Sequence, residues 1–234
     1  MSKMKTKEYE VKIVNEDMKK MRNAVRKMGS TRVHGPICMR RCVFYHCKSK
    51  INGFVRIREE YGNVVKITCK QFGRGKYATE HELVSNKNYE DTVDFFVQCG
   101  LVKKSEIETT REKWIHKDAN EIVFDTWPGI PEYMEVECKD EDRLHKIMGR
   151  LNVPRQNIMY SGVDTLYREY YGLSKHRVNN KTPVLRYETV QSDLGIKRGN
   201  KGYKKIRELS KIYQTKKRHY QCGHKFRQTR KKRN

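Results

Sequence analysis

The stretch Glu8-Tyr9-Glu10-Val11-Lys12, close to the N-terminus, decides how the rest of the chain is interpreted. Its charged residues alternate with Tyr9 and Val11, so an extended strand places the three charged side chains on one face and the other two on the opposite face. An ordinary half-buried strand carries mixed polar residues on its solvent face. Here that face holds two carboxylates and one ammonium group, which indicates a strand whose polar side has a task of its own.

Further along the chain, ionisable residues again stand two positions apart within alternating segments. These sets are Arg56 and Arg58, Lys66 with Thr68 and Lys70, Glu80 and Glu82, Arg111 and Lys113, and Glu135 and Glu137. The alternation predicts strands at residues 7–14, 54–59, 64–70, 78–84, 107–115, 121–126 and 133–138. Turn signals such as Asn52-Gly53 and Pro128-Gly129 separate several of them, which favours an antiparallel sheet.

Apolar residues recur at helical spacing in four other segments. The spacing predicts helices over 18–28, 88–100, 140–151 and 163–171, with Asn88 and Asp140 as N-caps. Residues 175–181 are interpreted as a linker, 201–219 as one basic helix and 225–234 as disordered. The predicted fold is α+β: a closed antiparallel β-barrel of about eight strands with helices packed outside.

If the charged faces of these strands close around a lumen, about six carboxylates meet about six cations there. Arg binds phosphate oxygens in a bidentate fork, Lys acts as a point charge, and clustered carboxylates hold Mg²⁺ or Mn²⁺. Such a lumen suits a polyphosphate. The alternative is a sheet with one wet face, on which the charges pair as ordinary salt bridges across the strands. A single pair of this kind favours the alternative, whereas the repeated pairs in alternating register favour the lumen.

The charge of the chain is concentrated toward the C-terminus. The 234 residues hold 52 Lys and Arg against 28 Asp and Glu, a net charge of +24. Residues 174–234 hold 20 Lys and Arg against three acids, and so carry +17 of it. We therefore expect a body over 1–173 and a basic, partly helical or disordered tail over 174–234. The tail suits nucleic acid, since its aromatic residues can stack on bases, but a solubilising tail is the alternative.

The cysteines and the apolar runs point to a compartment. The seven cysteines form no CxxC pair, and their number is odd. The N-terminal residues resemble no secretory signal, and no apolar run approaches the roughly 18 residues of a membrane span. These features predict an intracellular protein with free thiols and no membrane partner, in the cytoplasm or in a compartment rich in nucleic acid such as the nucleus.

Taken in order, the alternating segments resemble the CYTH proteins, the superfamily of triphosphate tunnel metalloenzymes. Residues 8–12 match the ExExK signature of that superfamily, which includes class IV adenylyl cyclases, thiamine triphosphatases and inorganic triphosphatases. ExExK alone is a weak motif, but the ordered set is specific and spans about residues 5–173. Its other segments are Val55-Arg56-Ile57-Arg58, Ile67-Thr68-Cys69-Lys70, Glu80-His81-Glu82, Arg111-Glu112-Lys113-Trp114, Phe124 to Gly129, Tyr133-Met134-Glu135-Val136-Glu137, and Tyr167 to Gly172.

The resemblance implies a role for each residue of the set. The implied metal ligands, for Mg²⁺ or Mn²⁺, are Glu8, Glu10, Glu135 and Glu137. The implied phosphate contacts are Lys12, Arg56, Arg58, Lys70, Arg111 and Lys113. The implied catalytic residues are Lys12, Glu80 and Glu82, of which the two glutamates order a water or a second ion. Asp125 matches an acid near the tunnel mouth.

One position departs from the superfamily pattern. Thr109 stands where a lysine often precedes the arginine that matches Arg111. Either one phosphate contact is missing here, or Lys113 replaces it from two residues further on.

Three functions fit this combination. The first is a metal-dependent phosphohydrolase that cleaves a nucleoside, organic or inorganic triphosphate, with the 5′-triphosphate end of RNA as one candidate substrate because of the tail. The second is a class IV-type adenylyl cyclase, in which the ribose 3′-hydroxyl attacks the α-phosphorus. The third is a non-catalytic nucleic-acid-binding protein on the same scaffold. The carboxylates argue against the third, because a pure anion binder gains nothing from acids in its lumen.

Overall fold

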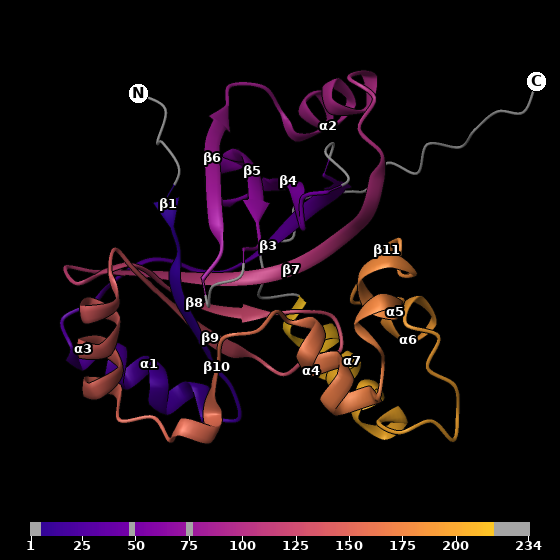
Figure 1. Ribbon diagram of the computed structural model, residues 1–234. Helices are drawn as coiled ribbons and strands as arrows, with labels where there is room; N and C mark the ends of the chain where they lie inside the picture. The colour runs from indigo at the N-terminus through magenta and orange to yellow at the C-terminus, as the bar shows by residue number, and fades with distance from the viewer. Residues whose placement is uncertain (1–5, 47–49, 74–76, 218–234) are drawn as a thin grey trace, which may run out of the picture.

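The computed structural model describes residues 6–46, 50–73 and 77–217. Within them, eleven strands form one sheet in the order β1-β6-β5-β4-β3-β7-β8-β9-β2-β10, and β11 pairs with β7 (Figure 1). The strands are β1 Thr6–Lys7, β2 Tyr9–Ile13, β3 Thr31–Tyr45, β4 Gly53–Glu59, β5 Val65–Gln71, β6 Thr79–Ser85, β7 Lys103–His116, β8 Ala119–Thr126, β9 Tyr133–Cys138, β10 Ile158–Met159 and β11 Val184–Leu185. The α-helices are α1 Met18–Lys27, α2 Tyr89–Gln98, α3 Glu141–Leu151, α4 Asp164–Tyr171, α5 Lys175–Asn180, α6 Val190–Asp193 and α7 Tyr203–Lys217, with 3-10 turns at Tyr61–Asn63 and Arg155–Asn157.

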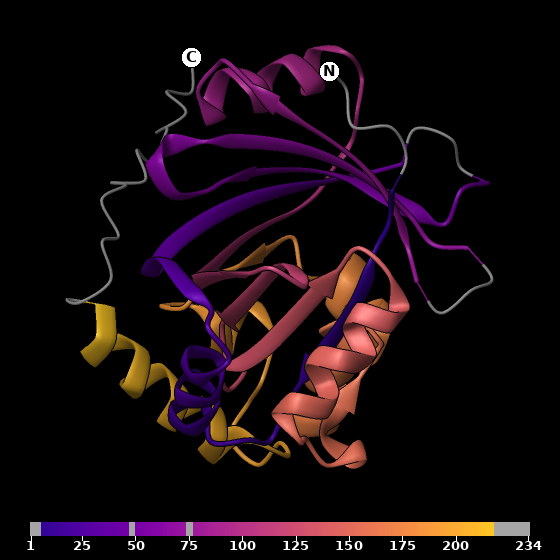
Figure 2. The ribbon, with the colours of Figure 1, turned by 90° about the vertical axis from the view of Figure 1, so that its left-hand side faces the viewer.

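The sheet is antiparallel except where β11 pairs with β7, and it curls strongly on itself (Figure 2). Its two sides meet at the N-terminal segment, where β1 pairs with β6 and β2 pairs with β9. Glu8 lies between these two strands and donates its backbone N–H to the carbonyl of Ala78, at 3.1 Å. Only two residue pairs join β1 to β6. The sheet is therefore a curled half-barrel with a narrow seam rather than the continuous closed barrel predicted from the sequence.

The apolar faces of the strands point outward and are covered by helices. Helices α1 and α3 bury Val25, Leu144 and Ile147 against the outer faces of β2, β8 and β9, where Val11 and Val136 are also buried. Asp17 and Asp140 cap these helices by accepting backbone N–H groups of the first turn. This packing leaves the charged faces of the same strands on the concave side of the sheet.

Helix α2 covers a second outer face, formed by β3, β4 and β5. Val93 of the helix packs with Phe44 and Ile57, which are fully buried. Asn88 caps this helix as predicted, since its side chain accepts the N–H of Asp91 at 2.8 Å.

The third core joins the body to the segment that follows it. Tyr167 of α4 and Ile130 pack with Leu185, Leu194 and Ile206, all buried. The sequence predicts a body that ends at residue 173 and a separate tail. The structure instead places β11, α6 and part of α7 in one core with α4, and helix α5 occupies most of the predicted linker at 175–181. Only the predictions for residues 218–234, including disorder at 225–234, lie outside the described residues.

Two further observations concern the thiols and the helices. Cys42, Cys69, Cys99 and Cys138 are free, whereas Cys38 takes part in a disulfide, so the expectation of free thiols is wrong at that position. Pairing of cysteines depends on their distance in space, which their spacing in the sequence does not give. Among the residues that the structure describes, no helix combines the length and the apolar character that crossing a membrane requires.

Candidate active site

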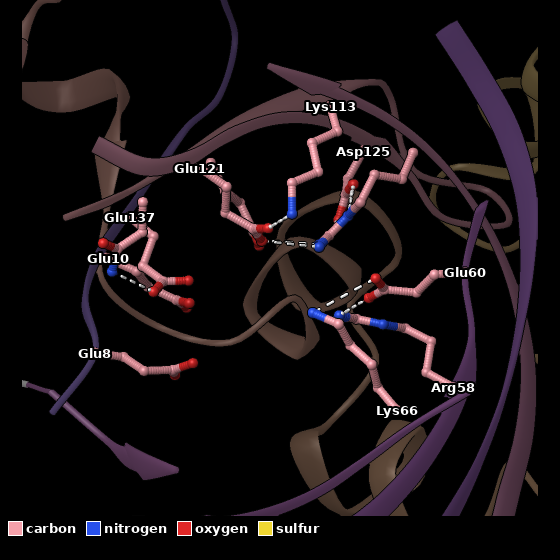
Figure 3. Close-up of polar contacts among 12 residues, drawn as sticks. Glu8, Glu10, Arg58, Glu60, Lys66, Lys113, Glu121, Asp125 and Glu137 are labelled. Carbon is pink, nitrogen blue, oxygen red and sulfur yellow. Dashed lines mark hydrogen bonds and ion pairs between the residues drawn. The ribbon is translucent and has the colours of Figure 1, made fainter. Parts of the chain in front are cut away.

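The concave face of the sheet bounds a space, here called the lumen, into which the alternating charged side chains point from both sides (Figure 3). The strand register decides which of them face each other, because residues directly opposite in an antiparallel pair share a face. Two rows of like charge result, one on each side of the lumen.

The first, the acidic row, crosses three neighbouring strands. Glu10 of β2 lies opposite Glu137 of β9, which in turn lies opposite Glu121 of β8. Burial and the nearby Glu121 raise the pKa of Glu137 to about 7. The side chain of Glu137 accepts a hydrogen bond from the amide of Asn120 at 2.9 Å, and no cation of the described residues pairs with it. The row therefore holds more negative charge than its surroundings neutralise.

The second, the basic row, also crosses three neighbouring strands. Arg58 of β4 lies opposite Arg41 of β3 on one side and opposite Lys66 of β5 on the other. One carboxylate, Glu60, bridges part of the row: it pairs with Arg58, and its second oxygen lies 3.5 Å from the ammonium group of Lys66. In the strand order, β3, β4 and β5 lie across the curled sheet from β2, β9 and β8.

The two rows bear on the two interpretations that the sequence leaves open, a ligand-binding lumen and a wet face of ordinary salt bridges. Like charges directly opposite each other in a sheet are destabilising. A face organised only for stability would alternate the signs across neighbouring strands. Here the acids of the acidic row stand side by side, as do the bases of the basic row, while other pairs across the strands, such as Lys12 with Glu135 and Lys70 with Glu80, combine opposite signs. The arrangement favours a lumen that awaits ligands of both signs.

Lys12 links the acidic row to Glu135. Its ammonium group lies 2.6 Å from Glu10 and 3.2 Å from Glu135. Burial alone would lower the pKa of Lys12, but these two carboxylates raise it above its ordinary value. Burial likewise raises the pKa of Glu10, yet Lys12 and Lys70 outweigh it and lower that pKa to about 2. Lys12 therefore stays charged between these two carboxylates.

Lys70 holds a second group of carboxylates beside the seam. Its ammonium group lies 2.6 Å from Glu8 and 2.9 Å from Glu80. Burial is the largest influence on Glu8, and with the nearby Glu80 it raises the pKa of Glu8 to about 9 despite Lys70. One cation therefore serves two buried carboxylates, which again leaves room for an added cation.

Arg111 is saturated by acids. Its guanidinium forms a bidentate pair with Asp125, at 2.8 and 2.7 Å, and a further bond of 3.1 Å to Glu121. Asp125, predicted near the tunnel mouth, is 1% exposed and lies beneath this guanidinium. Lys113 also pairs with Glu121, at 2.6 Å.

The remaining predicted residues line the same lumen. Glu82 lies 2.9 Å from the ammonium group of Lys66 and accepts the hydroxyl of Thr68 at 3.3 Å. Arg56 donates to the same hydroxyl at 3.2 Å. The structure thus brings together the whole predicted set, which is Glu8, Glu10, Lys12, Arg56, Arg58, Lys70, Glu80, Glu82, Arg111, Lys113, Glu135 and Glu137. Their roles stay predictions.

Four lumen residues were not in the predicted set. Lys66 was named among the alternating ionisable residues but was given no role, and Glu121 could have been found because it stands at even spacing from Asp125. Arg41 could not, since Arg40 and Arg41 are adjacent and alternation cannot say which of them faces inward. Glu60 lies just after the end of β4, so the alternation within that strand does not include it.

The donor set has the chemistry for a hard divalent cation. Carboxylate oxygens are what Mg²⁺ and Mn²⁺ bind, and burial together with neighbouring carboxylates raises the pKa values of Glu8 and Glu137. No cluster of three or more potential metal ligands is preformed within the described ranges. Mg²⁺ commonly binds through one or two carboxylates together with substrate phosphates, so such a cluster is not required. The residues Glu10, Glu135 and Glu137 fit this mode.

Comparison with known proteins places the fold. No family model matches the chain, and no curated protein matches it either. Solved structures do match. A protein of Pyrococcus horikoshii OT3 superposes with a TM-score of 0.56 at 13% identity, covering 66% of this chain and 96% of its own. A protein of Vibrio parahaemolyticus, provisionally named an adenylate cyclase, gives 0.58 at 11% identity, with 69% and 97% covered.

A second protein of Pyrococcus horikoshii OT3 gives a TM-score of 0.54 at 20% identity, covering 69% of this chain and 98% of its own. The chain shares its fold with these structures, and this is the fold that its resemblance to the CYTH proteins predicts. The match covers nearly the whole of each CYTH structure and about two thirds of this chain, so about a third of the chain lies outside the shared fold.

Proposed function

We propose that this chain is a metal-dependent phosphohydrolase that binds a triphosphate in the lumen and cleaves its terminal phosphate. The observation that supports this most is the segregation of charge, with the acidic row facing the basic row across the lumen. A polyphosphate with bound divalent cations presents both signs at once. In this proposal the curled sheet works as a tunnel around that ligand.

The basic side residues bind and orient the substrate. Arg56, Arg58 and Lys66 contact phosphate oxygens and hold the chain of phosphates extended. Lys12, fixed by Glu10 and Glu135, places positive charge where negative charge develops in the transition state. These contacts need no movement of the strands, since the side chains already point into the lumen.

The acidic residues serve the metal and the water. Glu10, Glu135 and Glu137 hold the divalent cation, and Glu80 and Glu82 orient the attacking water and accept its proton. The water oxygen forms a bond to the terminal phosphorus while the bond from that phosphorus to the bridging oxygen breaks. When bound, the cation neutralises phosphate charge and orients the phosphate chain.

The second candidate is adenylyl cyclisation. The same lumen serves it if the α-phosphorus, rather than the terminal one, faces the nucleophile. The provisional name of the Vibrio protein concerns cyclase activity in that protein and keeps this candidate in the test.

The substrate itself is a finer proposal. The net charge of +17 over residues 174–234 favours a substrate attached to a polyanion, and the 5′-triphosphate end of RNA meets that description. A free nucleotide, thiamine triphosphate or inorganic triphosphate needs no such charge.

A substrate panel with product analysis tests these proposals. Inorganic triphosphate, ATP, thiamine triphosphate and triphosphate-ended RNA are incubated with Mg²⁺ and, separately, with Mn²⁺. Orthophosphate as the product supports hydrolysis, whereas cyclic AMP with pyrophosphate supports the cyclase. Absence of turnover of every substrate with both metals would contradict the proposed activity. Wild-type turnover in Glu10→Gln would contradict the metal site.

A further inference from the structure

Several buried hydrogen-bond donors at and beside the basic side of the lumen have no hydrogen-bond partner. Among the described residues, these are the Nε groups of Arg41, Arg56 and Arg58 and the indole N–H of Trp127. Leaving a buried charged donor unsatisfied is costly, so such groups in a native structure call for a ligand or a water. Arg41 and Arg58 are only 5% and 4% exposed.

Arg41 is held in place by neutral neighbours rather than by an acid. Its Nη2 donates to the hydroxyl of Thr109 at 2.8 Å, and its guanidinium lies 4.6 Å from the ring centre of Trp127. Thr109 is fully buried and Arg41 faces Arg58 directly across β3 and β4. Burial and the positive charges of Arg56 and Arg58 lower the pKa of Arg41 to about 9. The contacts with Thr109 and Trp127 hold this guanidinium in position, and the charge of Asp125 compensates it only in part.

Arg41, Arg56 and Arg58 differ from Arg111, whose guanidinium is fully paired with acids. Arg111 has a bidentate carboxylate partner and a second acid, whereas Arg56 and Arg41 donate to threonine hydroxyls. In the basic row, the one carboxylate that pairs with Arg58 is Glu60. Of these three guanidinium groups, Arg58 forms the direct ion pair, with Glu60, whereas Glu80 acts on Arg56 and Asp125 acts on Arg41 through their charges alone.

We propose that Arg41, with Arg56 and Arg58, forms a preformed anion pocket that binds one phosphate of the substrate, and that Thr109 and Trp127 position Arg41 for this contact. This rests on the proposed function and deepens it by adding a substrate-binding residue. Position 109 is where the superfamily pattern has a lysine. In this chain the cation comes from the neighbouring strand instead, and Thr109 orients it rather than replacing it.

Binding of inorganic triphosphate, measured by calorimetry without metal and with chelator present, tests the pocket. The matched control is Arg40, the adjacent residue on the opposite face of β3, which pairs with Glu59 at 2.6 Å outside the lumen. Both Arg41→Gln and Arg40→Gln lower the net charge of the chain by one, so the comparison separates the contact at position 41 from the loss of net charge. We expect Arg41→Gln to weaken binding by about 10- to 100-fold, as for a charge-assisted contact, and Arg40→Gln by less than about twofold.

Two further variants separate contact from positioning. Arg41→Lys keeps the charge but loses the planar fork, and should bind with intermediate affinity. Thr109→Val keeps the volume but removes the hydroxyl, and should weaken binding about several-fold without changing net charge. If Arg41→Gln or Arg41→Lys fails to fold, Thr109→Val still tests the pocket, because binding equal to wild type in that variant overturns the positioning of Arg41.

The outcomes also separate this inference from the proposed function. Equal affinities for Arg41→Gln and Arg40→Gln, in a protein that binds and hydrolyses triphosphate with metal, overturn the pocket alone. Weakened binding in Arg41→Gln supports the pocket even if the wild type hydrolyses nothing with Mg²⁺ or Mn²⁺, and only the proposed activity then fails. A wild type that does not bind inorganic triphosphate without metal overturns the pocket, and the substrate panel with Mg²⁺ and Mn²⁺ then decides the proposed activity separately.

Discussion

Replacing Glu137 with glutamine should stabilise the metal-free protein while it impairs metal binding. Glu137 lies between Glu10 and Glu121 in the acidic row, and its pKa is raised from 4.5 to about 7. A carboxyl group with a raised pKa in the folded state costs stability once it ionises. The cost is absent below about pH 4.5, grows as the pH rises toward 7, and is complete above that.

The magnitude follows from the pKa. The pKa of Glu137 lies about 2.5 pH units above its ordinary value, and each pH unit corresponds to about 1.4 kcal/mol. The ionised carboxylate therefore lowers the free energy of unfolding by at most about 3 kcal/mol. Glu137→Gln removes the charge and keeps the volume, and its carbonyl can still accept from Asn120. We expect the free energy of unfolding at pH 8, without metal, to rise by up to about 3 kcal/mol, and to change little at pH 4.

Urea unfolding at both pH values, with chelator and then with excess Mg²⁺, measures this. Wild type should gain stability on addition of Mg²⁺, because a ligand that binds the folded state stabilises it, and the variant should gain much less. Glu106→Gln is the control: its exposed pair with Lys103 contributes less than about 1 kcal/mol at either pH. A loss of stability at pH 8 in Glu137→Gln would refute the reasoning, because it would mean that the carboxylate serves the fold through an ordinary ion pair.

The remaining predictions concern the metal, the substrate, pH and the C-terminal segment. Glu10→Gln should abolish metal-dependent turnover with the fold intact by circular dichroism, since it removes a charged ligand without removing volume. Arg58→Ala should weaken triphosphate binding by about 1.5–3 kcal/mol in a titration. Burial raises the pKa of Glu60, but Arg58 and Lys66 outweigh burial and lower this pKa to about 2. The ionised Glu60 therefore stabilises the fold fully above about pH 4.5, and this stabilisation is lost as the pH falls toward 2. Glu60→Gln should be about 3 kcal/mol less stable than wild type at pH 6, and the difference should shrink toward pH 2. A chain that stops after Gly172 should fail to fold, whereas a chain that stops after Lys217 should fold. If residues 218–234 contact nucleic acid, the chain that stops after Lys217 should also bind RNA more weakly than the full chain, with less dependence on salt.

The truncation replaces a simpler expectation from charge alone. The charge distribution of the sequence predicts a separate tail after residue 173, so a chain ending near Gly172 would be expected to keep the barrel and its activity. The core formed with α4 includes Leu185, Val190, Leu194, Ile196 and Ile206, each less than 5% exposed. Burial of each contributes about 1.5–3 kcal/mol, and together they match the total stability of about 5–15 kcal/mol of a typical domain. These apolar residues are scattered among basic ones, so neither periodicity nor composition reveals their shared partner surface.

The site was more predictable than the fold around it. The lumen residues that were predicted come from strands with strict alternation, and the period of two fixes their face wherever the strand lies. Strand β3 was missed although it is the longest, at 15 residues. Its pairing with β7 shifts register at three places, and it contains Pro36 and the adjacent pair Arg40 and Arg41, so no alternation persists along it. Which arginine enters the lumen was settled by packing of Phe44 and its neighbours against α2.

The C-terminal segment also bears on the lumen, through the turn that carries Trp127. Tyr187, which follows β11, donates a hydrogen bond from its hydroxyl to the carbonyl of Thr126 at 2.5 Å. The ring of Tyr213 in α7 stacks on the ring of Tyr187, with 3.6 Å between the ring centres. Trp127 in turn lies against the guanidinium of Arg41. A contiguous set of contacts therefore runs from Tyr213 of α7 to Arg41 in the lumen. Because like charges gather in that lumen at a cost in stability, the apolar and aromatic packing outside the sheet must offset it, and the segment after residue 173 supplies part of that packing directly behind Arg41.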